Sequence, residues 1–167
     1  MKSKNPCRPI DLLKELVPYI VATAVPLFVF SCLLMLVRVD GSSMRPGLSD
    51  GDLILCNRTR MPGRGDIAVL ESGGELLVKR VIGLPEDELC IEGGVVYVNG
   101  CPLDEPYVHD PDNVGADYGT ITVPEGCVFV LGDNRGVSRD SRSASVGCVP
   151  LERIMATMSF RIWRGHG

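Results

Sequence analysis

One lysine and one serine lie in local sequences that could support covalent chemistry. Lys79 is the only lysine after Lys14, and it lies in the apolar run Leu76-Leu77-Val78-Lys79-Arg80-Val81-Ile82-Gly83-Leu84. Strand alternation places Leu77, Lys79 and Val81 on one face of this run. Burial there disfavours the charged ammonium and lowers the lysine pKa, so that a neutral amine becomes available as a base. A strand-end lysine that extends to water is the alternative interpretation.

The serine lies in the segment Gly41-Ser42-Ser43-Met44-Arg45-Pro46. Glycine and proline on either side favour a turn that presents a serine hydroxyl and leaves backbone N–H groups free to face an oxyanion. The alternative is an ordinary polar linker.

A third stretch, from Gly132 to Arg142, concentrates polar groups after the apolar run Cys127–Leu131. Its sequence, GDNRGVSRDSR, holds two carboxylates, three guanidiniums and two hydroxyls within eleven residues. Opposite charges at such short spacing favour a loop whose hydrogen bonds and ion pairs are satisfied internally and that supports a neighbouring site. A solvated turn is the alternative.

Histidine and metal chemistry have little basis in this sequence. The two histidines, His109 and His166, lie in a polar loop and at the penultimate position, and neither has a motif around it. No CxxC spacing provides zinc ligands or a redox pair. We therefore predict no metal site and no cofactor. Residues 39–167 hold twelve basic and nineteen acidic residues, which argues against nucleic acid as a partner.

A membrane anchor is predicted near the N-terminus. Residues 16–37 form a run of 22 residues without a charge, long enough to cross a bilayer as one helix. Four basic residues precede the run and predict a cytoplasmic N-terminus. A cleaved signal peptide is the alternative, but the run is longer than the usual apolar core and no small-x-small site follows it. We divide the chain into a cytoplasmic segment (1–15), a transmembrane anchor (16–38) and an extracytoplasmic domain (39–167).

The extracytoplasmic domain is predicted to be mostly β, an antiparallel β-sandwich or partly open barrel behind the single helix. Gly93-Gly94 and Asn99-Gly100 are hairpin signals, and residues 102–119 indicate a long surface loop. Eight segments combine β-branched residues, partial alternation and flanking turn residues: Asp52–Asn57, Asp66–Glu71, Glu75–Gly83, Glu88–Ile91, Val95–Val98, Thr120–Val123, Cys127–Leu131 and Arg153–Trp163.

The seven cysteines do not predict a disulfide framework. Five fall in the extracytoplasmic domain, at positions 56, 90, 101, 127 and 148, and an odd number leaves at least one unpaired. A hairpin turn at Gly93-Gly94 places Cys90 opposite Tyr97 and not opposite Cys101. Most of these cysteines are expected to be buried apolar thiols.

Together the three stretches resemble the type I signal peptidase (leader peptidase) family, membrane proteases with a Ser/Lys site that remove signal peptides. The resemblance extends over nearly the whole chain. Ser42-Ser43-Met44-Arg45-Pro46 resembles the nucleophile box Ser-Met-x-Pro of that family, and Arg64-Gly65-Asp66-Ile67-Ala68-Val69 its Gly-Asp box. Lys79-Arg80-Val81-Ile82-Gly83-Leu84-Pro85 resembles its lysine box. The last box is matched by Gly132-Asp133-Asn134 together with Ser138-x-Asp140-Ser141-Arg142.

The resemblance implies that Ser43 is the nucleophile and Lys79 the general base. It also implies that Ser138 hydrogen-bonds the lysine amine. Five further residues would hold the geometry of the site: Arg80, Asp133, Asn134, Asp140 and Arg142.

The chain departs from the family pattern at three positions. Gly47 replaces the usual Thr, and Glu86 replaces a Gly. Gly41 stands where some members carry a serine that donates to the oxyanion, so the second oxyanion donor is not identified by sequence. The short spacing between the lysine box and the last box is similar to that of the compact, Gram-positive-like branch.

The resemblance implies a monomeric, membrane-bound endopeptidase that cleaves secretory preproteins at small-x-small sites and uses no cofactor. The substrate would bind as an extended strand beside the segment entering Ser43 and the strand of Lys79, with Met44 and Leu77 as candidate pocket residues. Three alternatives are open: a dedicated processing protease for a pilus or conjugation substrate, a non-catalytic assembly factor of the same fold, and an unrelated membrane-tethered β-domain.

Overall fold

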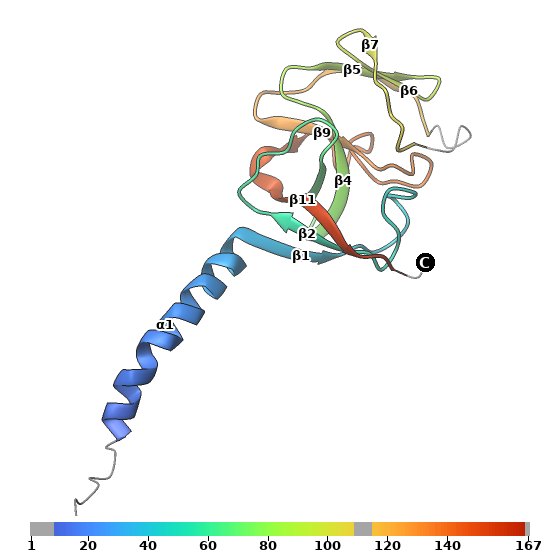
Figure 1. The fold of residues 1–167 in the computed structure, drawn as a ribbon. Coiled ribbons are helices and arrows are strands. Elements are labelled where there is room, and N and C mark those ends of the chain that lie inside the picture. Colours follow the sequence, from blue (N-terminus) through green and yellow to red (C-terminus); the bar gives the residue numbers. More distant parts are fainter. Residues whose placement is uncertain (1–8, 109–114, 166–167) are drawn as a thin grey trace, which may run out of the picture.

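The computed structural model describes residues 9–108 and 115–165, which form one N-terminal helix and two antiparallel sheets. Helix α1 (Pro9–Leu33) projects away from the β-domain (Figure 1). Strand β1 (Leu34–Arg38) continues directly from it into the larger sheet. The smaller sheet lies at the end of the domain remote from α1 (Figure 1). The predicted fold class is confirmed.

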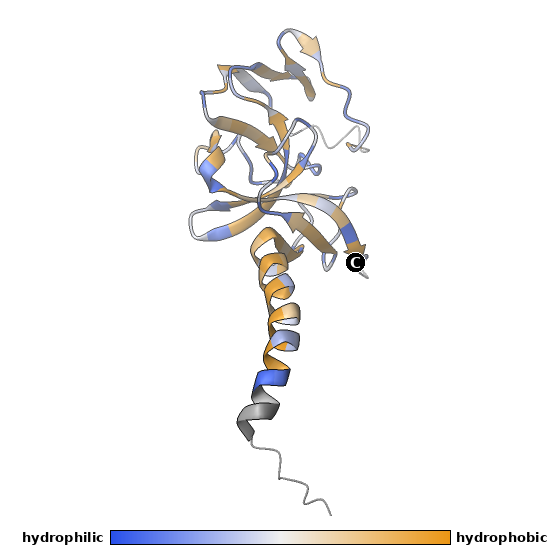
Figure 2. Ribbon diagram, turned by 60° about the vertical axis from the view of Figure 1, so that its left-hand side comes forward, coloured by the Kyte–Doolittle hydropathy of each residue, from blue (hydrophilic) through white to orange (hydrophobic). Residues whose placement is uncertain are grey.

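Helix α1 is long and apolar enough to cross a membrane, judged by length and composition. The candidate span is Lys14–Leu33, with a mean hydropathy of 2.1, and none of it is buried against the domain. Its apolar character extends over most of its length (Figure 2). The helix ends at Leu33, five residues before the end of the predicted anchor segment. Residues 34–38 pair with β2 (Leu53–Asn57), which satisfies the backbone groups along one side of β1.

The larger sheet has seven strands in the order β1-β2-β11-β3-β4-β9-β10. The 3-10 helix η1 (Leu151–Arg153) separates the last two strands of the sequence. The strands other than β1 are β2 (Leu53–Asn57), β3 (Ile67–Ser72), β4 (Glu75–Gly83), β9 (Cys127–Leu131), β10 (Val149–Pro150) and β11 (Ile154–Trp163).

The smaller sheet has four strands in the order β7-β6-β5-β8. Cys90 pairs with Tyr97 across the first hairpin, as predicted, and Asn99 (φ 52°) with Gly100 (φ 75°) forms the second turn. All cysteines among the described residues are free thiols. The expectation that most of the five domain cysteines are buried is wrong: only Cys56 is buried, three are partly exposed and Cys101 is exposed. The strands are β5 (Glu88–Glu92), β6 (Val95–Val98), β7 (Cys101–Pro102) and β8 (Tyr118–Thr122).

All eight predicted strands are present, each with bounds within two residues of those expected. Three strands were not predicted. Strands β7 and β10 have only two residues each and carry no alternation, and β1 is hidden in the apolar run that begins in the membrane anchor.

Strand β9 lies between two hydrophobic clusters and fixes the loop that follows it. Val128 and Val130 pack on one side, with Val81 and Ala68, while Phe129 and Leu131 pack with the smaller sheet. Because both faces of β9 are buried, its C-terminal end has little freedom. The polar loop that begins at Gly132 therefore starts from a fixed point.

Candidate active site

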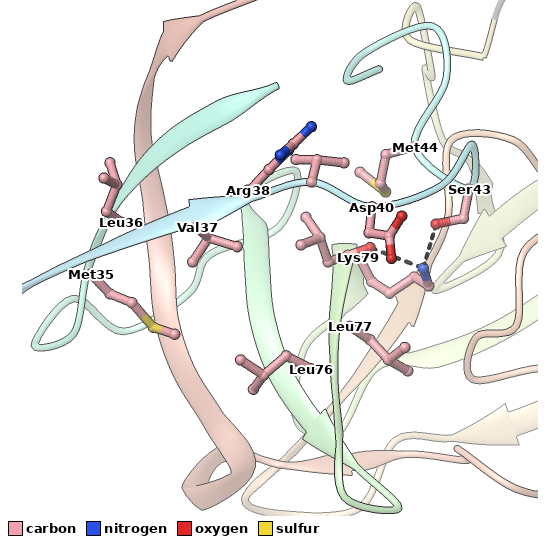
Figure 3. A pocket seen from close by; sticks show the side chains of 12 residues that line it. Met35, Leu36, Val37, Arg38, Asp40, Ser43, Met44, Leu76, Leu77 and Lys79 are labelled. Atoms are coloured by element: carbon pink, nitrogen blue, oxygen red, sulfur yellow. Dashed lines mark hydrogen bonds between the residues drawn. The ribbon is translucent and has the colours of Figure 1, made fainter. Parts of the chain in front are cut away.

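Ser43 and Lys79 are hydrogen-bonded to each other, although 36 residues separate them in the sequence. Lys79 Nζ donates to Ser43 Oγ at 2.7 Å and to the carbonyl oxygen of Val78 at 3.0 Å (Figure 3). Lys79 comes from β4 and is only 3% exposed, while Ser43 lies in the turn that follows β1. The structure therefore brings the two candidate catalytic groups into the geometry that proton transfer requires.

Burial lowers the pKa of Lys79 to about 8. The carboxylates of Asp140 and Asp133 oppose this effect, and the guanidinium of Arg139 adds to it. With a pKa near 8, about a tenth of the lysine is neutral at pH 7. A neutral amine that already contacts a serine hydroxyl can act as a general base.

The serine turn is held by hydrogen bonds to the polar loop and by one buried side chain. The backbone N–H of Asn134 donates to the carbonyl of Ser43 at 3.0 Å, and its side-chain amide donates to the carbonyl of Ser42 at 3.2 Å. Met44 is 1% exposed and belongs to the core cluster beneath β1. On the other side, the N–H of Gly41 donates to the Asp50 carboxylate at 2.8 Å.

Arg80 and Asp133 form a bidentate ion pair beside the serine turn. Arg80 Nε and Nη2 donate to the two carboxylate oxygens at 2.8 and 2.7 Å, and Nη1 donates to the carbonyl of Gly65 at 2.7 Å. Asp133 is 1% exposed. A Cβ at Gly47 would collide with Asp133 Oδ2, so the glycine that replaces the usual Thr of the nucleophile box is explained by this close approach.

The remainder of the polar loop is an internal network, as its composition predicted. Asp140 is fully buried and accepts from the Gly132 N–H at 3.0 Å and from Arg142 Nε at 2.9 Å. Arg142 also donates to the carbonyl of Arg135 at 2.6 Å. Ser141 Oγ accepts from the backbone of Val130 at 2.9 Å, which connects the loop to β9.

Ser138 does not make the predicted hydrogen bond to the lysine amine. Its Oγ is buried and has no hydrogen-bond partner within the described parts of the chain, since Lys79 donates to Ser43 and Val78 instead. The side chain packs against the backbone of Gly132, where any Cβ would collide with it. Ser138 is therefore close to the nucleophile turn but contacts it by packing.

A groove of about 290 Å³ leads to Ser43 and Lys79. It lies between β1 with its continuation and the first half of β4 (Figure 3). Strand β9 pairs only with the second half of β4, which leaves one edge of the first half of β4 without a partner among the described strands. Strand β1 is the end strand of the sheet, so its outer edge is also open. Both candidate pocket residues, Met44 and Leu77, line the groove. Others that line it were not predicted: Met35, Leu36, Val37, Arg38, Val39, Asp40, Leu76 and Val78.

Comparison with known proteins gives the family. The sequence profile described as "Signal peptidase, peptidase S26" matches residues 10–163. The chain belongs to this signal peptidase family. The S26 assignment confirms the resemblance seen in the sequence boxes.

Several signal peptidases are similar to the chain over most of its length. It is 38% identical to a signal peptidase I of Bacillus caldolyticus, over 87% of this chain and 88% of that protein. It is 33% identical to signal peptidase I S of Bacillus subtilis, over 96% of this chain and 94% of that protein. The crystal structure of a signal peptidase I from Enterococcus faecalis superposes with a TM-score of 0.53 at 33% identity, covering 60% of this chain and 98% of that one.

Tyr107 and Glu105, in the predicted long loop, contact residues of the site and were not predicted from the sequence. The Arg80 guanidinium carbon lies 3.9 Å from the ring centroid of Tyr107, and Arg135 donates two hydrogen bonds to Glu105. Residues 102–119 have the composition of a surface loop, and no local signal marks these two side chains.

The prediction that the signal peptidase has no metal site is untested at His109 and His166, which lie outside the described residues. Among the residues that are described, no group of three or more His, Cys, Asp or Glu side chains could hold a metal ion. The Ser43–Lys79 arrangement requires none for acyl transfer.

Proposed function

We propose that this protein is a membrane-anchored serine endopeptidase that removes N-terminal signal peptides from secretory preproteins, with Ser43 as nucleophile and Lys79 as general base. The observation that carries the proposal is the 2.7 Å contact between a buried lysine amine and the serine hydroxyl. Membership of the signal peptidase family supports the reaction and the substrate class.

In the proposed mechanism, neutral Lys79 accepts the proton of Ser43 as the serine oxygen attacks the scissile carbonyl. The backbone N–H of Ser43 is the proposed donor to the oxyanion, and Gly41 has no side chain to add a second donor. The lysine ammonium then protonates the departing amine, which leaves an ester on Ser43. The same amine takes a proton from water, and the resulting hydroxide attacks the ester and releases the signal peptide.

The substrate is proposed to bind as an extended strand between β1 and β4. Both strand edges that border the groove are open to backbone hydrogen bonds from a peptide. Apolar side chains, including Met44 and Leu77, line the groove, and they are proposed to accept small side chains such as Ala at the first and third positions before the cut. We propose a monomer that needs no further protein partner for cleavage.

The domain is proposed to lie outside the cytoplasm, with α1 across the membrane and the N-terminus inside, because basic residues precede the helix. Ser43 follows Leu33 by ten residues. At roughly 3.3–3.6 Å per extended residue, the nucleophile lies within about 35 Å of the helix end. Preproteins would reach it as their apolar segment emerges from the bilayer.

The test is cleavage of a preprotein with an Ala-x-Ala site by the detergent-solubilised full chain. Ser43→Ala and Lys79→Ala should both be inactive while keeping the thermal transition of a folded domain. Failure of the wild type on a panel of preproteins would refute general signal peptide removal. Activity that survives in Lys79→Ala would show that another group is the base.

A further inference from the structure

We propose that the segment Leu103–Val108, which leaves the smaller sheet, is a positioning element for the active site and acts through Glu105 and Tyr107. The inference rests on the proposed Ser43–Lys79 chemistry. Neither residue lines the groove, so neither would touch the substrate. Their effect would pass through two arginines, Arg80 and Arg135.

Tyr107 covers one face of the Arg80 guanidinium, whose edges are held by hydrogen bonds. Asp133 and the Gly65 carbonyl bind the edges of the guanidinium, and the Tyr107 ring covers its face at 3.9 Å. A planar cation bound at its edges and stacked on one face has few other rotamers available. Arg80 follows Lys79 directly in β4, so this restraint acts one residue from the proposed base.

Glu105 restrains the polar loop through Arg135. The Arg135 side chain is 2% exposed and donates to both carboxylate oxygens of Glu105, at 2.9 and 2.5 Å. Arg135 Nε also donates to the Gly132 carbonyl at 3.1 Å. Arg135 follows Asn134, the residue whose N–H and amide hold the serine turn. A buried guanidinium without its carboxylate would have to move or draw in water.

The two restraints form one unit. Tyr107 Oη donates to Glu105 Oε1 at 2.7 Å, so the ring over Arg80 and the carboxylate on Arg135 fix each other. The segment is tied to the smaller sheet by the Leu103 N–H, which donates to the Val96 carbonyl at 2.8 Å, and by packing of Leu103 into that sheet's cluster. The smaller sheet contributes no groove residue, yet the segment that leaves it contacts Arg80 and Arg135, the two arginines beside the site.

The competing explanation is that these contacts only stabilise the fold. The chain offers a matched control, because Tyr118 is also a tyrosine of this region and packs on Phe129 at a centroid distance of 5.4 Å, away from the arginines. Tyr107→Leu and Tyr118→Leu remove the same atoms. Only the first removes the ring from Arg80.

The experiment uses the full chain in detergent and compares wild type, Tyr107→Leu, Tyr107→Phe, Glu105→Gln and Tyr118→Leu. Each is assayed for kcat and KM with a peptide carrying an Ala-x-Ala site. Each is also assayed for the rate at which a small fluorophosphonate modifies Ser43, a reaction that releases fluoride and makes no use of the groove. The thermal midpoint of each variant is recorded.

For Tyr107→Leu and Glu105→Gln we expect kcat and the phosphonylation rate to fall together by about tenfold, the scale typical of residues that orient a reactive group, with KM little changed. Tyr107→Phe keeps the ring over Arg80 and should retain activity within about threefold. Tyr118→Leu should lower the thermal midpoint and leave both rates near wild type.

Equal losses of rate in Tyr107→Leu and Tyr118→Leu, or a lower midpoint in Tyr107→Leu with unchanged rates, would overturn the inference. If Tyr107→Leu does not fold, Glu105→Gln and Tyr107→Phe decide the question, and wild-type rates in Glu105→Gln would overturn it. A wild type that cleaves no preprotein and does not react with the fluorophosphonate would instead refute the proposed function itself.

Discussion

The lysine and the serine of the site are held by different kinds of structure. Lys79 sits within a regular strand, paired through Ala68 of β3, and the hydrophobic core that buries it also lowers its pKa. Ser43 sits in an irregular turn held by individual hydrogen bonds from Asn134. The proposed base is therefore fixed by packing that many residues share, whereas the proposed nucleophile depends on a few specific contacts. Substitutions should affect the two accordingly.

The largest effect is expected at Lys79. Lys79→Met keeps the length of the side chain and removes the base, so the rate of preprotein cleavage should fall by at least about 10³-fold. A single-turnover assay at high enzyme concentration measures the residual rate. Hydrolysis within a factor of ten of wild type would show that the amine is not the base.

The same variant should be more stable than wild type at neutral pH. The folded-state pKa of about 8 lies below the 10.5 of a lysine in water, so folding disfavours the protonated lysine. This cost, on the order of 3 kcal/mol, is present in full below pH 8 and disappears as pH rises through 10.5. Urea unfolding of Lys79→Met and wild type at pH 7 and pH 10 measures it. A difference that does not shrink at pH 10 would contradict the assignment.

A smaller effect is expected in the serine turn. Asn134→Ala removes the hydrogen bond from the side-chain amide to the Ser42 carbonyl. It keeps the hydrogen bond from the backbone N–H to the Ser43 carbonyl. One hydrogen bond of about 1 kcal/mol corresponds to a loss of roughly fivefold in kcat. Steady-state kinetics test this, and Asn99→Ala, in a hairpin remote from the groove, is the control for amide loss. A KM effect without a kcat effect would assign Asn134 to substrate binding.

The pH profile should shift with the charge at position 139. The cleavage rate should rise as pH increases through about 8, because only the neutral amine accepts the serine proton. Arg139 lowers the pKa of Lys79, so Arg139→Ala should move the profile to higher pH, and Arg139→Lys should leave it near its original place. A profile that moves to lower pH in Arg139→Ala would exclude this electrostatic role.

The smallest effect is expected in the turn after β4. Glu86 is an exposed, non-glycine residue at φ 69°, the position where the family pattern has glycine. Glu86→Gly should relieve this conformation and raise stability by about 1 kcal/mol without changing kcat. Asn99→Gly at φ 52° should gain no stability, since asparagine tolerates this region and its side chain donates to Asp87 and accepts from the Glu88 N–H. Thermal unfolding compares the two variants. A loss of stability in Glu86→Gly would show that contacts of the Glu86 side chain stabilise the turn by more than its backbone conformation costs.

Most of the fold could be predicted because the strands carry local signals. Alternation located eight strands, and the residues of four boxes located Ser43, Lys79 and the loop around Asp133. The strand β1 could not be predicted, since an apolar strand that follows an apolar helix continues the same pattern. For the same reason the groove wall formed by Val37 and Val39 was assigned to the anchor and its immediate continuation.

What the sequence could not supply were contacts between distant segments. Tyr107 and Arg80 are 27 positions apart in the sequence, and a polar loop does not reveal which of its side chains turn inward. The orientation of Ser138 was inferred from the family pattern. Its hydroxyl instead lies against Gly132, and the lysine amine donates to Ser43 and to the Val78 carbonyl.

The direct passage from α1 into β1 has a consequence for which bond is cut. No flexible tether separates the two: the carbonyl of Leu33 accepts a hydrogen bond from Arg58, and Leu34 already pairs with Asn57. With α1 across the membrane as proposed, Ser43 would lie at a fixed height above the bilayer. A substrate whose scissile bond emerges higher or lower would be out of reach, so the anchor would contribute to the choice of cleavage site.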